Sequence, residues 1–226
     1  MRNRKLTNRG GSMVEFTMLV PVWLPLLIGT LWIGSSMIRG QQVTQMARDL
    51  ASMYSRDSTN LNFAAAPTTS SNAVLDDITK QLGTLTSTGN GVVIFSTITY
   101  AGNSFCASGG STYGATTPSL SHTGNCTNYG HFVFTQQYVQ GNTSLLTSRF
   151  GTPPASDMDA NYNVSTVTAL TDTADVSTFN LISPVPQENG SDGYQSGQPI
   201  YVVEVYFQSQ GLAGYTKGGD YAYAVF

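Results

Sequence analysis

The chain has 226 residues and a formal net charge of −3, and only 10% of its residues are charged. That length suits one membrane segment and one compact domain, and it excludes two large domains. The part after Arg56 carries eleven acidic residues against three basic ones. Such a surface repels a phosphate backbone, so we expect no nucleic-acid partner.

The sequence starts with a basic leader, residues 1–10, and then has no charged residue between Glu15 and Arg39. At about 1.5 Å per residue, residues 16–38 would span roughly 35 Å, comparable with a hydrocarbon core of about 30 Å. Because the basic residues precede this run, we expect the N-terminal side to stay in the cytoplasm and the C-terminal part to be exported. A single carboxylate at the N-terminal end of such a helix is costly to bury, so we expect Glu15 to interact with a partner.

The apolar run has a simpler interpretation, as a secretory signal cleaved at the small residues Gly34 and Ser36, before Met37. The apolar core of such a signal usually has about 7 to 15 residues, whereas this run is longer and begins beside a carboxylate. Both features favour a retained transmembrane helix.

The N-terminal helix is expected to cover residues 11–56 and to leave the membrane as an amphipathic extension at 41–56. Pro21 and Pro25 each remove an amide donor, which predicts a helix kink or a melted turn, although membrane helices also tolerate prolines without a purposeful bend. The apolar residues of the extension recur at helical spacing: Val43, Met46, Ala47, Leu50, Ala51, Met53 and Tyr54.

The rest of the chain predicts a linker and a β-rich domain. Residues 57–71 are rich in Ser, Thr, Asn and Ala and indicate a linker. A short helix is expected at Asn72–Leu82. Beyond Gly91 the apolar residues recur at every second position, as in β-strands. The expected fold is α+β, in which the long transmembrane and amphipathic helix is followed by an exported head domain, residues 72–226, with an antiparallel β-sheet and long loops. The predicted strands are Val92–Tyr100, His131–Val139, Ile200–Ser209 and Tyr221–Phe226, with a weaker one at Tyr162–Leu170; the predicted long loops are Cys106–Cys126 and Phe179–Gln198.

In the strand at Ile200–Ser209 the alternation of side chains predicts one buried and one solvated face. We expect Glu204 and Gln208 to point to solvent. The opposite set is expected to face a core: Tyr201, Val203, Val205 and Phe207.

Cys106 and Cys126 have two possible roles. With His122 and His131 they would supply two sulfur and two imidazole ligands, which suits tetrahedral zinc. The spacing lacks the close ligand pairs of zinc sites, and an exported domain favours oxidation, so we expect a disulfide and no metal.

Asp157, Asp159, Asn161 and Asn163 place oxygen ligands at every second residue, as calcium loops do. The glycine and the bidentate glutamate that complete such a loop are absent, which favours a solvated polar turn.

The chain has two histidines and no motif of a known catalytic type, so we expect neither an enzyme nor a cofactor. Aromatic side chains in the late strands suit core packing better than a carbohydrate-binding face.

The order of residues from Arg9 to Phe16, just before the apolar run, resembles a class III signal of the kind that prepilin peptidases process. The pattern of glycine, then a glutamate and aromatic pair, then an apolar helix is similar to that of TadE-like minor pilins or pseudopilins of the tight-adherence (Flp, type IVc) pilus system. The resemblance implies cleavage between Gly10 and Gly11. Glu15 and Phe16 would then be the fifth and sixth residues of the mature chain, at the positions used in assembly.

The resemblance covers roughly Arg9 to Arg56 and implies a structural subunit that enters or initiates a pilus for adhesion. The implied partners are the major pilin and other pilin-like subunits, the prepilin peptidase and an inner-membrane platform protein. The implied location is the bacterial inner membrane with an exported C-terminal domain, and after assembly an extracellular pilus or the cell surface. In a filament, Glu15 of one subunit would neutralise the Gly11 amine of its neighbour. The alternative is a membrane-anchored or secreted surface-binding module, resembling an adhesin, that never enters a filament.

Overall fold

A computed structural model describes residues 11–57, 82–102, 105–106, 126–179, 196–208 and 218–226. The chain divides into two compact units, an N-terminal unit that ends at Gln41 and a C-terminal unit that begins at Gln42. The elements are α1 (Gly11–Asp57), β1 (Gly91–Tyr100), β2 (Phe132–Gly141), the 3₁₀ turn η1 (Ala155–Asp157), α4 (Thr166–Thr171), the 3₁₀ turn η2 (Thr173–Asp175), β3 (Pro199–Gln208) and β4 (Gly219–Val225).

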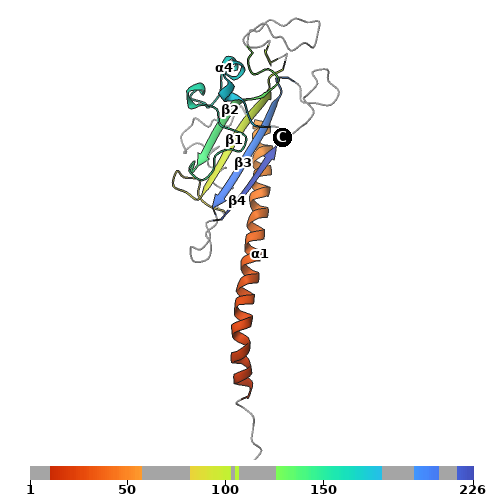
Figure 1. Ribbon diagram of the computed structural model, residues 1–226, viewed down its shortest axis with the longest axis vertical. Helices are drawn as coiled ribbons and strands as arrows, with labels where there is room; N and C mark the ends of the chain where they lie inside the picture. Colours follow the sequence, from red (N-terminus) through yellow and green to blue (C-terminus); the bar gives the residue numbers. More distant parts are fainter. Residues whose placement is uncertain (1–10, 58–81, 103–104, 107–125, 180–195, 209–217) are drawn as a thin grey trace, which may run out of the picture. The chain divides into compact units, whose positions relative to one another are not determined.

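The described strands form one antiparallel sheet in the order β2-β1-β3-β4, as Figure 1 shows. All four predicted strong strands are confirmed, with ends that differ by one or two residues. β-Branched and aromatic residues dominate them, and such side chains suit a pleated, packed surface. The α+β fold expected from the sequence, with a long N-terminal apolar helix followed by an antiparallel sheet, is therefore confirmed.

Both faces of the sheet are covered. One face packs against the C-terminal part of α1 through Val93, Phe95, Val203 and Val205. The other face packs against the segment 126–179, in a second apolar cluster. Every residue of β1 is buried as a consequence, which explains why apolar residues follow one another from Val92 to Phe95 instead of alternating with polar ones.

A register shift occurs between Thr97 and Ile98 of β1. Thr97 pairs with Gln136 and Ile98 with Phe134, so Thr135 of β2 is the extra residue of a β-bulge. The Thr135 carbonyl accepts a hydrogen bond from Val164 N at 2.9 Å. The bulge thus attaches the covering segment to the edge of the sheet.

The weaker strand predicted at Tyr162–Leu170 is wrong. Asn163 and Val164 make only isolated bridges, and the chain then enters α4. The Ser165 side chain accepts a hydrogen bond from Thr168 N and so caps this helix, which gives the backbone a local alternative to a strand ladder.

Several predictions concern residues outside the described ranges: the leader at 1–10, nearly all of the linker at 57–71, the helix at Asn72–Leu82 except for its last residue, and most of the two long loops. They stay predictions.

Candidate functional site: an apolar assembly helix

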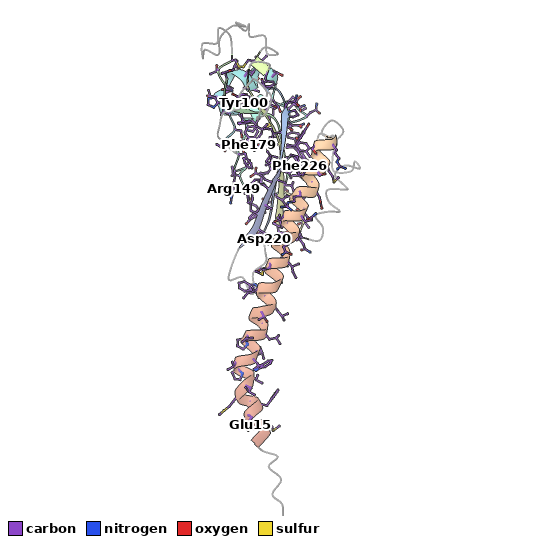
Figure 2. All side chains as sticks on the ribbon, turned by 90° about the vertical axis from the view of Figure 1, so that its right-hand side faces the viewer. Glu15, Tyr100, Arg149, Phe179, Asp220 and Phe226 are labelled. Atoms are coloured by element: carbon purple, nitrogen blue, oxygen red, sulfur yellow. A yellow bond between two sulfur atoms is a disulfide. The ribbon has the colours of Figure 1, made fainter. Side chains whose placement is uncertain are left out.

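The N-terminal unit contains the part of α1 that presents apolar side chains on every side (Figure 2). Met18, Trp23 and Leu31 are 75%, 68% and 66% exposed, and the large apolar residues around them are similar. A helix that is apolar all round needs lipid or other helices around it. Among the described residues, α1 is the helix long and apolar enough to cross a membrane, by length and composition.

Four hydroxyl groups in this apolar part of α1 are hydrogen-bonded to the helix itself. Thr17 Oγ1 donates to the carbonyl oxygen four residues earlier at 2.7 Å. The hydroxyls of Thr30, Ser35 and Ser36 each donate to the carbonyl three residues earlier at 2.9 Å. Since an unsatisfied polar group in hydrocarbon costs several kcal/mol, these bonds make the segment compatible with an apolar surrounding.

The predicted processing and assembly residues lie at the start of α1. Gly10 lies outside the described residues, and Gly11 is the first residue of the helix. Glu15 is exposed and Phe16 is 69% exposed. Within the described part of the chain Glu15 makes no hydrogen bond and no ion pair. The carboxylate is thus available to a group from another molecule.

Pro21 and Pro25 lie inside α1, and the backbone is helical at both. Each proline lacks the amide donor of a regular turn and leaves one carbonyl without its partner. The predicted kink stays a prediction.

The C-terminal part of α1 belongs to the C-terminal unit and changes character. Its apolar residues are buried against the sheet on one side, and its polar residues face solvent. Ala47 and Ala51 are fully buried, and their small side chains bring the helix backbone close to the sheet. The amphipathic stripe predicted for residues 41–56 is confirmed, except that Met53 is 39% exposed; its buried members are Val43, Met46, Ala47, Leu50, Ala51 and Tyr54.

Tyr54 ends this stripe with polar contacts as well as packing. Its hydroxyl lies 2.7 Å from Thr97 Oγ1 and donates to Gln136 Oε1 at 2.9 Å. Its ring meets Phe95 edge-on at 5.3 Å and Tyr201 at 5.1 Å between centroids. The contacts attach α1 to β1, β2 and β3 at the point of the β-bulge. From sequence, Tyr54 was only a member of the stripe, and its polar partners come from strands distant in the chain.

Glu204 does not point to solvent as predicted; its side chain is fully buried. The expectation was wrong because the second face of the sheet is covered by the segment that contains Ser148 and Arg149. Oε1 accepts hydrogen bonds from Arg149 N at 3.0 Å and from the Tyr221 hydroxyl at 2.7 Å, and Oε2 accepts one from Ser148 Oγ. The sequence signal for this second covered face is the run of consecutive apolar residues from Val92 to Phe95 in β1.

The contacts of Glu204 are structural in character. Both carboxylate oxygens accept hydrogen bonds, and the Arg149 guanidinium lies 4.1 Å from the ring centroid of Tyr221 in a cation–π contact. Burial, and then the hydrogen bond to Glu204, raise the pKa of Tyr221 above its ordinary value. The arrangement buries a carboxylate with its partners and offers no open base to a substrate.

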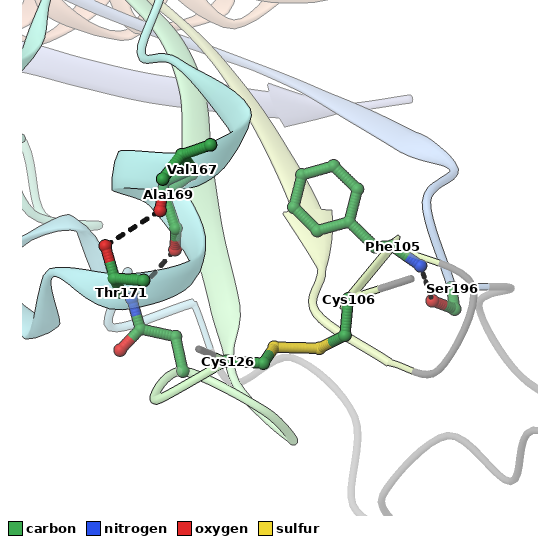
Figure 3. The surroundings of a disulfide bond; sticks show 8 residues. Phe105, Cys106, Cys126, Val167, Ala169, Thr171 and Ser196 are labelled. Carbon is green, nitrogen blue, oxygen red and sulfur yellow. Dashed lines mark hydrogen bonds between the residues drawn. A yellow bond between two sulfur atoms is a disulfide. The ribbon is translucent and has the colours of Figure 1, made fainter. Parts of the chain in front are cut away.

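Cys106 and Cys126 form a disulfide, with Cα atoms 5.8 Å apart, as predicted (Figure 3). Next to it, Ser196 Oγ accepts a hydrogen bond from Phe105 N at 2.9 Å, so the start of the bridged loop is attached to the segment before β3 (Figure 3). Oxidised sulfurs are not zinc ligands, which removes the alternative metal set; His131 is exposed, and His122 lies outside the described residues.

The Asp159 carboxylate stabilises a local turn by accepting hydrogen bonds from the residues that follow it, which agrees with the predicted polar turn. It accepts hydrogen bonds from Asn161 N at 2.7 Å and Asn163 N at 2.9 Å, and the bonds from Asn163 lower its pKa. Tyr162 has a φ of 63°, the left-handed conformation that this tight turn requires. Within the part of the chain that the structure describes, no group of three or more His, Cys, Asp or Glu residues is placed to hold a metal ion.

Comparison with known proteins gives one match. The family model described as TadE-like protein matches residues 10–52, about a fifth of the chain. No curated protein and no solved structure matches the chain. The matched segment coincides with α1 and confirms the resemblance seen in the sequence.

The TadE-like match indicates involvement in the Tad pilus system, whose TadE-like components are structural rather than enzymatic. An exposed apolar helix followed by a globular sheet domain fits a membrane-anchored component of such a system, one that interacts with other pilus components.

Proposed function

We propose that this chain is a pilin-like subunit, cleaved between Gly10 and Gly11 by a prepilin peptidase and incorporated through α1 into a Tad-type pilus or its initiating complex. The observation that carries the proposal is the contrast between the two parts of α1. The part before Gln41 is apolar on all sides, whereas the part after Gln42 is buried against its own sheet. The family match starts at residue 10, beside the proposed cleavage position, and ends within the buried part.

Cleavage would change the chemistry at the start of the helix. Removal of residues 1–10 would strip four basic side chains and create an α-amine on Gly11. Glu15 has no partner within the described part of the chain. In a bundle of apolar helices an unpaired carboxylate is costly, and the amine of a neighbouring subunit would neutralise it. The pairing would define the axial register between subunits.

The proposed partners follow from the same arrangement. They are the major pilin and other pilin-like subunits through α1, the prepilin peptidase at the leader and an inner-membrane platform protein. Before assembly α1 would lie in the inner membrane with the C-terminal unit exported, and after assembly the subunit would lie in a pilus or on the cell surface.

The test is N-terminal sequencing with intact mass on the protein from its native cell and from a strain without the prepilin peptidase. A start at Gly11 that depends on the peptidase supports the proposal. A start at Met1 in both strains would instead indicate an uncleaved anchor, as for a membrane-tethered surface-binding module. A start near Met37 would indicate an ordinary signal peptide and would rule out a filament subunit.

A further inference from the structure

Four buried side-chain oxygen atoms in the described part of the chain have no hydrogen-bond partner. They are Asn128 Oδ1, Asp157 Oδ2, and Asp175 Oδ1 and Oδ2. Buried polar atoms are nearly always paired, so each exception requires an explanation. All four atoms are hydrogen-bond acceptors. Among the described residues, no buried side-chain donor lacks a hydrogen-bond partner. A group with positive charge or with protons to donate would satisfy such acceptors.

The three residues come from separate segments of the cover on the second face of the sheet. Asp157 ends η1 and Asp175 ends η2. The Asp172 carbonyl accepts hydrogen bonds from Asn128 Nδ2 at 2.5 Å and from Asp175 N at 3.2 Å, which brings the Asn128 amide beside η2. Asp157 and Asp175 lie close enough to interact, because the charge of Asp157 is one of the causes that raise the pKa of Asp175.

The charges here are not compensated within the described residues. No Lys, Arg or His side chain among them forms an ion pair with Asp157, Asp172 or Asp175. Asp175 is fully buried, and an isolated buried carboxylate is costly unless a cation or a proton neutralises it. Asp172 adds a third negative charge, although its own Oδ1 is occupied by Ala174 N at 2.8 Å.

The geometry points to a calcium site formed by the carboxylates of Asp157 and Asp175 with the side-chain carbonyl of Asn128 beside them. Oxygen atoms alone suit a hard cation, whereas zinc prefers nitrogen and sulfur ligands. Calcium takes 6–8 oxygen ligands in flexible geometry, so water and backbone carbonyls complete a shell that two carboxylates begin. Magnesium demands near-ideal octahedral geometry and gives up its water reluctantly, which disfavours it at ligands from three separate segments.

The site differs from the calcium loop considered from the sequence. Asp159, Asn161 and Asn163 are engaged in their own turn and contribute no ligand. Asp157 alone is shared with that pattern, and its charge acts on Asp175, eighteen positions later in the chain. The inference does not depend on the proposed pilus function, since it rests on residues of the C-terminal unit only.

The test is calorimetric titration of the full-length protein in detergent micelles, freed of metal, with CaCl2 and separately with MgCl2 at constant ionic strength. We expect one calcium ion per chain with a dissociation constant of about 10⁻⁴–10⁻³ M, the range of extracellular modules with few ligands. D175N and D157N should each weaken calcium binding by about tenfold or more, because each removes one of the charges that hold the ion. The matched control is D220N, on β4 and outside the cluster, which should bind as the unmodified protein does.

Far-UV circular dichroism of D175N and D157N, compared with that of the unmodified protein, shows whether each variant folds. If one of them fails to fold, the other still tests the proposal. Absence of binding at millimolar calcium overturns the proposal. Equal binding by D175N, D157N and D220N also overturns it, since the ion would then bind elsewhere. Magnesium that binds as tightly as calcium would overturn the choice of calcium.

Discussion

The Tyr54 hydroxyl accepts a hydrogen bond from Thr97 Oγ1 at 2.7 Å, because its own proton goes to Gln136 Oε1 at 2.9 Å. A residue near the end of α1 is thereby bonded to the central strand and to an edge strand of the sheet. The register shift after Thr97 places both partners within reach of one hydroxyl.

Y54F should destabilise the C-terminal unit by about 1–3 kcal/mol, since the ring still packs but Thr97 and Gln136 lose a buried partner. Urea unfolding followed by circular dichroism measures the change. The matched control is Y223F, at a position on β4 that is 46% exposed, which should change stability by less than about 0.5 kcal/mol. Equal effects of the two variants would argue against a special role for Tyr54.

E15Q should leave the C-terminal unit folded and reduce incorporation into pili. Glu15 makes no hydrogen bond or ion pair with another described residue, so we expect its loss to cost little within the subunit. In the proposed filament the E15Q substitution removes the negative charge that neutralises the amine of a neighbouring subunit. Quantitative immunoblotting of sheared pili against whole cells measures incorporation, with E15D as the charge-retaining control. Normal incorporation of E15Q would contradict the pairing.

E204Q should destabilise the protein by about 3 kcal/mol, because hydrogen bonds to a charged acceptor are stronger than neutral ones and the amide nitrogen would face a donor. Chemical denaturation of E204Q and of the control D220N, at a half-buried position on β4, measures the difference. A change for E204Q as small as that of the control would show that the buried carboxylate contributes little.

Removal of the disulfide in the double variant C106S/C126S should lower the free energy of unfolding by about 3 kcal/mol, since the bridge closes a loop with a sequence separation of 20 residues. A reductant should lower the stability of the unmodified protein by the same amount and leave the double variant unchanged. If the variant responded to the reductant as well, the effect would not come from this bridge.

In the presence of a calcium chelator, the stability of the protein should fall as the pH rises through about 6. Burial, and then the charges of Asp157 and Asp172, raise the pKa of Asp175 from 3.8 to about 6. A folded-state pKa above the unfolded value adds stability that is complete below the unfolded pKa and is lost as the pH rises through the folded pKa.

Thermal unfolding at several pH values measures this loss. D175N should flatten the profile between about pH 4 and 7, because the titrating group is gone. Persistence of the same slope in D175N would mean that another group causes it.

The local elements were largely predictable from the sequence. The apolar run without charge between Glu15 and Arg39 determined a helix of membrane length, and the 3.6-residue recurrence of Val43 to Tyr54 determined which side of its extension is buried. The period-two segments determined four strands. Such patterns follow from the geometry of a single helix or strand with one buried side. They can be recognised without knowing which element packs against that side.

Which polar side chains are buried was decided by the tertiary structure alone. Glu204 occupies a position that alternation assigns to solvent, and it is buried because residues 142–179 return over the second face of the sheet. Thr166 to Leu170 have β-branched residues suited to a strand, and the Ser165 cap makes them a helix. Asn128, Asp157 and Asp175 lie far apart in the chain, so no spacing rule could bring them together. A sequence records periodicity along the chain, whereas burial and the meeting of distant carboxylates depend on how loops cover a sheet, which only the folded chain specifies.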